Sequence, residues 1–250
     1  MTTTAAPRAS RRRRTARRYV PPQHGAWAML IVPWLVGVLV AGFEWLHLPL
    51  LLAWLAGYLL SYYVMQAVKS RRPQRYRSQL LLYGVATLVA AVPVLALRPQ
   101  LFWYAPAYAL LLAVNLHYAW RRRERALVND IASIVQGSLM VPVAATVAGV
   151  AVAEVALPFA AVALYFLGTV FYVKTMIRER GSAAYYRASV AYHVLALVAV
   201  AWLLGPLPAG LFALLLVRAA LLPRRSLAPK QVGILEIIAS LLLVLAVLLG

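Results

Sequence analysis

The stretch from Leu48 to Val68 has the sequence LPLLLAWLAGYLLSYYVMQAV and contains no charged side chain. A helix needs about 20 apolar residues to cross roughly 30 Å of hydrocarbon, where its backbone polar groups must bond to each other. Apolar runs of similar length precede and follow this stretch along most of the chain. Because these runs are continuous instead of alternating, they favour helices over the strands of a barrel. We therefore predict an all-α fold, a polytopic transmembrane helical bundle.

The composition of the 250 residues agrees with a membrane protein and excludes several kinds of chemistry. Apolar and aromatic residues make up 64% of the chain and charged residues only 12%, which is outside the range of soluble domains. With no cysteine, the chain cannot form disulfides, iron–sulfur clusters or thiolate metal sites. Four histidines and six carboxylates leave little material for a metal site, so we expect neither a metal nor a cofactor.

The apolar runs predict nine spans, at roughly residues 26–43, 48–68, 79–97, 101–120, 128–152, 155–175, 188–204, 207–222 and 232–249. The charges test this number, because Lys and Arg in short loops favour the cytoplasm. With nine spans, all of the 25 basic residues except Arg98 fall on one side. We therefore expect a multi-pass protein of a bacterial cell membrane, with the amino terminus in the cytoplasm and the carboxyl terminus outside. Only Gly205-Pro206-Leu207-Pro208 separates the seventh and eighth spans, so a re-entrant pair is the alternative there.

Two regions differ sharply in composition. Residues 1–20 are expected to be a disordered, basic cytoplasmic tail, and residues 21–250 a single transmembrane domain. No apolar stretch with a cleavage site precedes the first span, so the tail is not expected to be a signal peptide. The formal net charge of +19 suits an anionic lipid surface. Nucleic-acid binding is the minor alternative, because the tail lacks interleaved aromatic residues and a folded module.

Most polar side chains inside the predicted spans lie toward the basic side. Tyr62, Gln66 and Lys69 share one face of the second span because of their helical spacing. The other polar residues that lie toward the basic side of their spans are Asn115, Asn129, Asp130, Lys174, Arg178 and His193. We predict that these side chains line a polar, basic pocket that faces the cytoplasm and binds an anionic lipid or a lipid diphosphate. For each residue alone, the alternative is a helix cap or a contact between helices.

Three residues are the candidates for catalysis. Asp130 and Glu236 lie inside predicted spans, where a charge costs roughly 2.5 to 3.5 kcal/mol on insertion scales, so both are expected to point inward. Either could act as a base. His24 precedes the first span and could assist proton transfer, because an unperturbed imidazole titrates near about pH 6.5. A helix cap, with Trp27 as an interfacial anchor, is the equal alternative for His24.

Three parts of the chain resemble the YwiC-like family of bacterial integral membrane proteins: Pro22-Gln23-His24-Gly25-Ala26-Trp27-Ala28-Met29, Asn129-Asp130 and Lys174-Thr175-Met176-Ile177-Arg178-Glu179-Arg180-Gly181. The resemblance covers nearly the whole chain after the Arg-rich tail. It implies a shared membrane topology and little about chemistry.

The layout also resembles, more faintly, the intramembrane prenyltransferases of the UbiA type. That resemblance implies Asp-rich motifs near the second and sixth spans, whose carboxylates hold magnesium ions that bridge a diphosphate. Here Lys69, Lys174 and Arg178 stand near those places. This departure argues against magnesium-assisted ionisation, because the metal needs several oxygen ligands. The three basic side chains could instead contact phosphate directly, as in a degenerate or metal-independent prenyltransferase-like protein.

Other functions stay open at this point. A transporter component would use the carboxylates inside the spans as a relay. A non-catalytic membrane scaffold would use its basic face to recruit anionic lipid or an acidic protein. A haem protein with ligands among His24, His117 and His193 is a weaker possibility.

Overall fold

The structure is a computed structural model that describes Tyr19, residues 26–225 and residues 227–250. Its helices are α2 (Ala26–Ala41), α3 (His47–Ser70), α4 (Arg77–Leu97), α5 (Ala105–Trp120), α6 (Leu127–Ser138), α7 (Met140–Val147), α8 (Ala156–Val173), α9 (Ala183–Leu203), α10 (Pro206–Leu221) and α11 (Pro229–Leu249). Short 3-10 turns lie at Pro73–Tyr76, Pro99–Tyr104, Val152–Val155 and Leu222–Arg224, and a π-helical turn lies at Lys174–Arg178. The predicted all-α class is confirmed.

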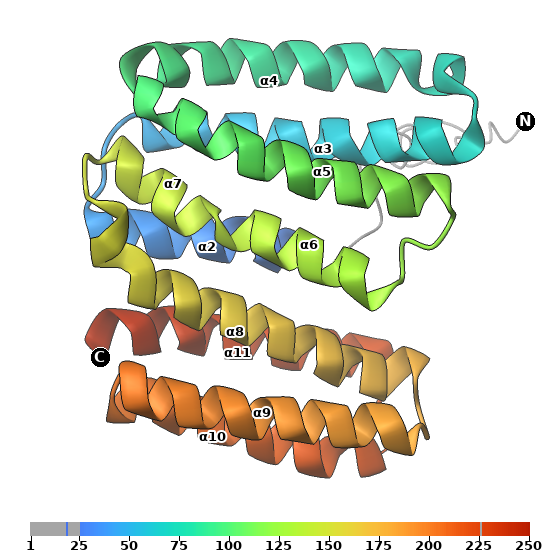
Figure 1. Cartoon of the computed structure of the whole chain (residues 1–250), viewed down its shortest axis with the longest axis vertical. Coiled ribbons are helices and arrows are strands. Elements are labelled where there is room, and N and C mark those ends of the chain that lie inside the picture. Colours follow the sequence, from blue (N-terminus) through green and yellow to red (C-terminus); the bar gives the residue numbers. More distant parts are fainter. Residues whose placement is uncertain (1–18, 20–25, 226) are drawn as a thin grey trace, which may run out of the picture.

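The helices in the described residues make nine crossings of the bundle, because α6 and α7 follow each other as one broken crossing (Figure 1). Seven of these crossings are long and apolar enough to span a bilayer. The other two are α2 and α5, with 16 residues each, and the turn Pro99–Tyr104 lengthens α5. Both α9 and α10 are among the seven long crossings, so the alternative of a re-entrant pair is not needed there.

The crossings lie side by side in an elongated array, in which consecutive crossings run antiparallel (Figure 1). α4 packs against α3 at one edge, and α9 and α10 form the opposite edge. α2 lies in the middle, where it packs against α7 and α11 and has Val36 fully buried. The largest buried cluster joins α2 to α6, α7 and the helices from α8 onward. The outer face of α4, with Leu88 and Val89 exposed, is left to contact lipid.

Two glycines allow α2 to approach the broken crossing closely. A Cβ atom added to Gly37 of α2 would lie 2.7 Å from the Val141 carbonyl oxygen and 2.8 Å from the Ala144 Cβ. A Cβ added to Gly137 of α6 would lie 3.1 Å from the Met29 carbonyl oxygen. Both glycines therefore serve the close packing of helices, as small residues commonly do in membrane proteins.

The break between α6 and α7 follows from Pro142. Proline has no backbone N–H, so Pro142 cannot donate a hydrogen bond to the carbonyl of Ser138, four residues earlier, and its ring crowds that carbonyl. α6 ends at Ser138 and α7 begins at Met140. The crossing is therefore built from two shorter helices joined at Leu139.

The basic residues gather at one end of the bundle, as predicted. The connections after α3, α5, α8 and α10 lie at the same end, and the other connections lie at the opposite end (Figure 1). Every described Lys and Arg except Arg98 belongs to this first end, which we call the basic end. Arg98 donates from Nε to the carbonyl of Val147 at 2.8 Å, so it caps the last turn of α7. That the basic end faces the cytoplasm stays a prediction, and the tail up to Arg18 and His24 lie outside the described residues.

Exposed aromatic side chains mark the opposite end. Trp45, Trp103 and Trp202 come from three separate parts of the chain, and Trp103 and Trp202 are each 85% exposed. Indole rings concentrate at the boundary between lipid and water because they combine an apolar body with an N–H donor. These residues are therefore suited to an interfacial belt at that boundary.

Candidate functional site

The beginning of α6 is the centre of a polar network at the basic end. The Lys174 Nζ atom lies 2.7 Å from the Asp130 Oδ2 atom and donates to the Arg125 carbonyl at 2.7 Å. The side chains of Lys174 and Asp130 are only 7% and 21% exposed. This ion pair therefore ties the end of α8 to the first turn of α6.

The π-helical turn that follows α8 sets the position of Lys174. The Glu179 N–H donates to the Lys174 carbonyl at 2.8 Å, across five residues instead of the four of an α-helix. Such wide turns are rare and occur frequently at functional sites. The turn leaves Lys174, Thr175 and Met176 buried, so the charged end of Lys174 reaches inward.

The same turn carries Ile177 and Arg178 to the surface, where both are exposed. Within the described part of the chain, the Arg178 side chain forms no hydrogen bond or ion pair. Its positive charge nevertheless acts on Asp130, together with the closer charge of Lys174. Arg178 is therefore a cation beside an ion pair that is already complete.

A second ion pair joins the end of α3 to the connection between α5 and α6. The Lys69 Nζ atom lies 2.5 Å from the Glu124 Oε1 atom, and both side chains are partly exposed. Partial burial opposes ionisation of Glu124, but its hydrogen bonds from Lys69 and the backbone, with the charges of Lys69 and Arg125, outweigh burial and lower the pKa of Glu124. Lys69 is thus neutralised within the protein.

Amide and hydroxyl groups continue the network between α5 and α6. Asn115 donates from Nδ2 to the Gln136 Oε1 atom at 3.0 Å, and its Oδ1 accepts from the Ser133 hydroxyl at 3.2 Å. Ser133 also donates to the Asn129 carbonyl at 2.9 Å, and Asn129 donates from Nδ2 to the Glu124 carbonyl at 2.8 Å. Asn115 and Asn129 are both buried. These bonds link the two ion pairs through the first turns of α6.

Tyr62 and Gln66 lie on α3, about two turns and one turn before Lys69. Both side chains are half-buried. The Tyr62 ring meets the Tyr63 ring edge-on, with 5.1 Å between centroids. The two residues share a helix with Lys69, and the structure gives them no direct bond to Asp130 or Lys174 in the part of the chain it describes.

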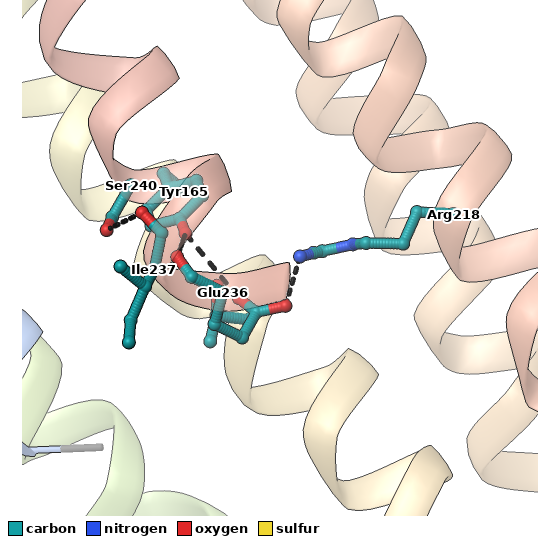
Figure 2. Close-up of polar contacts among 6 residues, drawn as sticks. Tyr165, Arg218, Glu236, Ile237 and Ser240 are labelled. Atoms are coloured by element: carbon teal, nitrogen blue, oxygen red, sulfur yellow. Dashed lines mark hydrogen bonds and ion pairs between the residues drawn. The ribbon is translucent and has the colours of Figure 1, made fainter. Parts of the chain in front are cut away.

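A third ion pair lies among α8, α10 and α11. Arg218 donates from Nη1 to the Glu236 Oε1 atom, reaching across from α10 to α11 (Figure 2). The second carboxylate oxygen of Glu236 accepts from the Thr169 hydroxyl at 2.8 Å, and the Tyr165 hydroxyl donates to the Glu236 carbonyl at 3.1 Å. The Arg218 side chain is 10% exposed and the Glu236 side chain 13%.

Further buried polar groups surround Arg218. Its Cζ atom lies 4.1 Å from the centre of the Tyr172 ring. His193 of α9 is buried, donates from Nδ1 to the Ser189 carbonyl at 2.7 Å and approaches Gly168 of α8, where an added Cβ would lie 3.1 Å from Nε2. We call Tyr172, Ser189, His193, Arg218 and Glu236 the Arg218 cluster.

The predicted site residues therefore fall into two groups. The network around α6 brings together Lys69, Asn115, Asn129, Asp130 and Lys174, with Arg178 beside it. Glu236 and His193 belong instead to the Arg218 cluster. His24 lies outside the described residues. Whether any of these residues binds a ligand or takes part in catalysis stays a prediction.

Several important residues did not stand out in the sequence. Arg218 and Glu124 belong to no recognisable motif, although an isolated arginine inside the apolar run LLLVRAAL indicates a partner in the membrane. His47, the first residue of α3, is another such residue. It is fully buried, accepts from the Glu44 N–H at 2.8 Å and bonds from Nε2 to the Ala144 carbonyl at 2.9 Å. Because Nδ1 accepts, the proton lies on Nε2, and His47 fastens the start of α3 to α7.

Among the residues that the structure describes, no three His, Asp or Glu side chains are grouped so that they could hold a metal ion. Asp130 on α6 and Glu236 on α11 are each engaged by a basic side chain. The arrangement is therefore chemically suited to recognising anions through its remaining basic groups.

Comparison with known proteins gives the family. Residues 20–145 match the family model described as YwiC-like protein. The chain is 34% identical over 230 residues to the Bacillus subtilis (strain 168) protein described as "Uncharacterized protein YwiC", an alignment that covers 88% of this chain and 92% of that protein. It is 33% identical over 215 residues to an "Uncharacterized protein" of Haemophilus influenzae, which covers 86% and 90%. No solved structure matches the chain significantly, so the resemblance to UbiA-type enzymes stays a prediction. The chain is a multi-pass membrane protein with bacterial relatives, and it belongs to the YwiC-like family.

Proposed function

We propose that the basic end binds an anionic lipid or an isoprenoid diphosphate, with Arg178 as its main contact. The observation that carries this proposal is the position of Arg178, exposed and unpaired within the described residues, beside the completed Lys174–Asp130 pair. A phosphate oxygen bound by Arg178 would gain a charge-assisted hydrogen bond that no protein carboxylate already occupies. Lys69 and Lys174 then hold the network together and add to the local positive potential.

The charge balance at the basic end supports an anionic ligand. Four carboxylates lie at this end within the described residues, namely Glu124, Asp130, Glu179 and Glu236, and three of them are paired with Lys69, Lys174 and Arg218. The remaining basic residues, including Arg121, Arg122 and Arg123, keep their charge. Such an excess next to a bilayer attracts anionic headgroups.

The neighbour of Arg178 supports a ligand with a hydrocarbon part. Ile177 is 42% exposed on the same turn, so an exposed apolar side chain stands next to the free guanidinium. A lipid presents the matching combination, with phosphate oxygens at the headgroup and an apolar chain attached. This combination favours a lipid-linked phosphate over a simple inorganic ion at this place.

The proposal is tested by binding of farnesyl diphosphate to the purified protein in detergent. We expect Arg178→Ala to weaken binding at least tenfold. The matched control is Arg77→Ala, which removes an exposed arginine from the same end but on the outer helix α4. Unchanged binding by Arg178→Ala would refute the proposal for the isoprenoid diphosphate. A parallel measurement in nanodiscs, with phosphatidylglycerol against phosphatidylcholine, distinguishes an anionic phospholipid as the ligand.

A transporter component is the second candidate, and the buried carboxylates support it. Asp130 on α6 and Glu236 on α11 each lie inside a crossing and each have a basic partner. Such pairs can open and close in a transport cycle. Ion or substrate flux in proteoliposomes that survives both Asp130→Asn and Glu236→Gln would contradict a mechanism based on these carboxylates.

A further inference from the structure

The Arg218 guanidinium uses only part of its hydrogen-bonding capacity. Nη1 pairs with Glu236, whereas Nε and Nη2 are buried and have no hydrogen-bond partner within the described residues. Nε–H and Nη2–H point in parallel from one edge of the planar group. This edge is the one that binds a carboxylate or a phosphate through two bonds at once.

Three more polar atoms of the Arg218 cluster are also buried and unpaired. The Tyr172 hydroxyl, the Ser189 hydroxyl and the His193 Nε2 atom are buried without a hydrogen-bond partner in the described part of the chain. Tyr172 and Ser189 are fully buried and His193 is 2% exposed. The Tyr172 ring lies against the guanidinium, and the charge of Arg218 acts on His193. Ser189 lies one helical turn before His193 on α9 and accepts the hydrogen bond of His193 at its carbonyl.

The unpaired atoms need a partner of a particular kind. A buried donor without a partner destabilises the protein, and a charged donor does so more strongly. In the neutral form with the proton on Nδ1, His193 offers an acceptor at Nε2, whereas the guanidinium edge and the two hydroxyls offer donors. Donors therefore outnumber acceptors. A group rich in acceptor oxygens satisfies this arrangement better than a water molecule, which brings two donors of its own.

We propose that Arg218 is the centre of a buried oxyanion site between α8, α9 and α10, which takes a carboxylate or phosphate group on the Nε–Nη2 edge. Arg218 lies in the last turn of α10, close to the basic end where anions gather. The Tyr172 ring covers one face of the guanidinium, so binding requires a local movement of this ring or of the helices beside it. This site differs from the exposed Arg178 in position and in burial, and it does not depend on the proposed function.

Glu236 gives the proposal a sharp test, because its negative charge competes with a bound anion for Arg218. Glu236→Gln keeps one oxygen that can accept from Nη1, and its NH2 group can donate to the Thr169 hydroxyl, but the substitution removes that charge. An oxyanion on Arg218 should therefore bind more tightly in Glu236→Gln than in the original protein. If Arg218 only held the helices together, this change would leave anion binding unaltered.

The experiment follows the thermal unfolding of the purified protein in detergent as sodium phosphate replaces sodium chloride at constant ionic strength. We expect a saturable rise in the unfolding temperature. The apparent Kd for phosphate should be at least fivefold lower in Glu236→Gln than in the original protein. It should be at least tenfold higher in Arg218→Lys, which keeps the positive charge but lacks the two parallel N–H donors of the guanidinium. Arg77→Ala, which removes an exposed arginine that belongs to neither site, should leave the phosphate effect unchanged. A phosphate effect that is lost in Arg178→Ala but kept in Arg218→Lys would belong to Arg178 and would refute this site. Nanodiscs with phosphatidylglycerol or phosphatidylcholine distinguish a lipid headgroup from a free anion as the source of the oxyanion.

Two further results would overturn the site. One is the lack of any saturable stabilisation by phosphate or by phosphatidylglycerol. The other is stabilisation that is equal in the original protein and in Glu236→Gln. Because Glu236→Gln retains the partner of Nη1, this second comparison is decisive even if Arg218→Lys does not fold.

Discussion

Replacing Gly37 by Ala should push α2 away from α7 and so weaken the packing between them. The added Cβ would lie 2.7 Å from the Val141 carbonyl oxygen and 2.8 Å from the Ala144 Cβ, both on α7. Ordinary carbon contacts need about 3.5 Å or more, so the two backbones must move apart by roughly 0.5–1 Å. Overpacking of this kind costs about 1–3 kcal/mol. The greater helix propensity of alanine offsets up to about 1 kcal/mol of this cost.

We therefore expect Gly37→Ala to lower the free energy of unfolding by about 1–2 kcal/mol. The measurement is unfolding of the detergent-solubilised protein by sodium dodecyl sulfate or by heat, followed by tryptophan fluorescence. Gly233→Ala is the matched control, because it makes the same change inside α11, where no atom lies within 4 Å of the added Cβ. The control should be as stable as the original protein or slightly more stable.

A second substitution locates the effect. Ala144→Gly, combined with Gly37→Ala, removes one of the two close contacts and leaves the contact with the Val141 carbonyl oxygen. The double variant should therefore regain part of the lost stability, beyond the sum of the two single changes. Equal stability of Gly37→Ala and Gly233→Ala would refute the tight packing of α2 on α7.

Three more outcomes follow from the polar contacts. Asp130→Asn and Lys174→Gln should each destabilise the protein by about 2–4 kcal/mol, and the double variant by less than their sum, in a double-mutant cycle of unfolding. Arg98→Ala should cost about 1 kcal/mol by removing the cap of α7, while exposed Arg77→Ala should cost nothing measurable. The lowered pKa of Glu124 predicts a stabilisation that is present above its ordinary pKa near 4.5 and is lost as the pH falls through the lower folded value. This acid-dependent loss, measured between about pH 7 and pH 3, should be smaller in Glu124→Gln.

The crossings, and the connections that share an end of the bundle, could be predicted because they depend on properties that are local in the sequence. Continuous apolar runs must form helices in hydrocarbon, and the position of Arg and Lys between them fixes which connections share an end. Arg98, the exception to the charge pattern, has a structural reason that only the fold reveals, since its partner Val147 lies 49 residues away. By contrast, the residue ranges of α3, α4 and α11 could be predicted from the apolar runs alone.

The pairing of charges could not be predicted in the same way. Helical spacing placed Lys69 on one face of its helix, and the cost of a charge in the membrane predicted that Asp130 points inward. Neither argument says which neighbour the side chain meets. Lys69 meets Glu124, and Asp130 meets Lys174. The lysines were expected to be free for phosphate, and their engagement by carboxylates moves the proposed contact to Arg178. Glu236 was expected to point inward, and its pairing with Arg218 depends on the arrangement of α10 beside α11.

The central place of α2 has a consequence for biosynthesis. α2 is the first described helix to leave the ribosome, yet its partners α7 and α11 follow about 100 and 200 residues later, which takes roughly 5–40 s at ordinary elongation rates. During that interval the side of α2 that carries Gly37 must contact lipid or the insertion machinery. A nascent chain that stops before α11 would keep one side of its innermost helix uncovered, and membrane quality control could recognise that side.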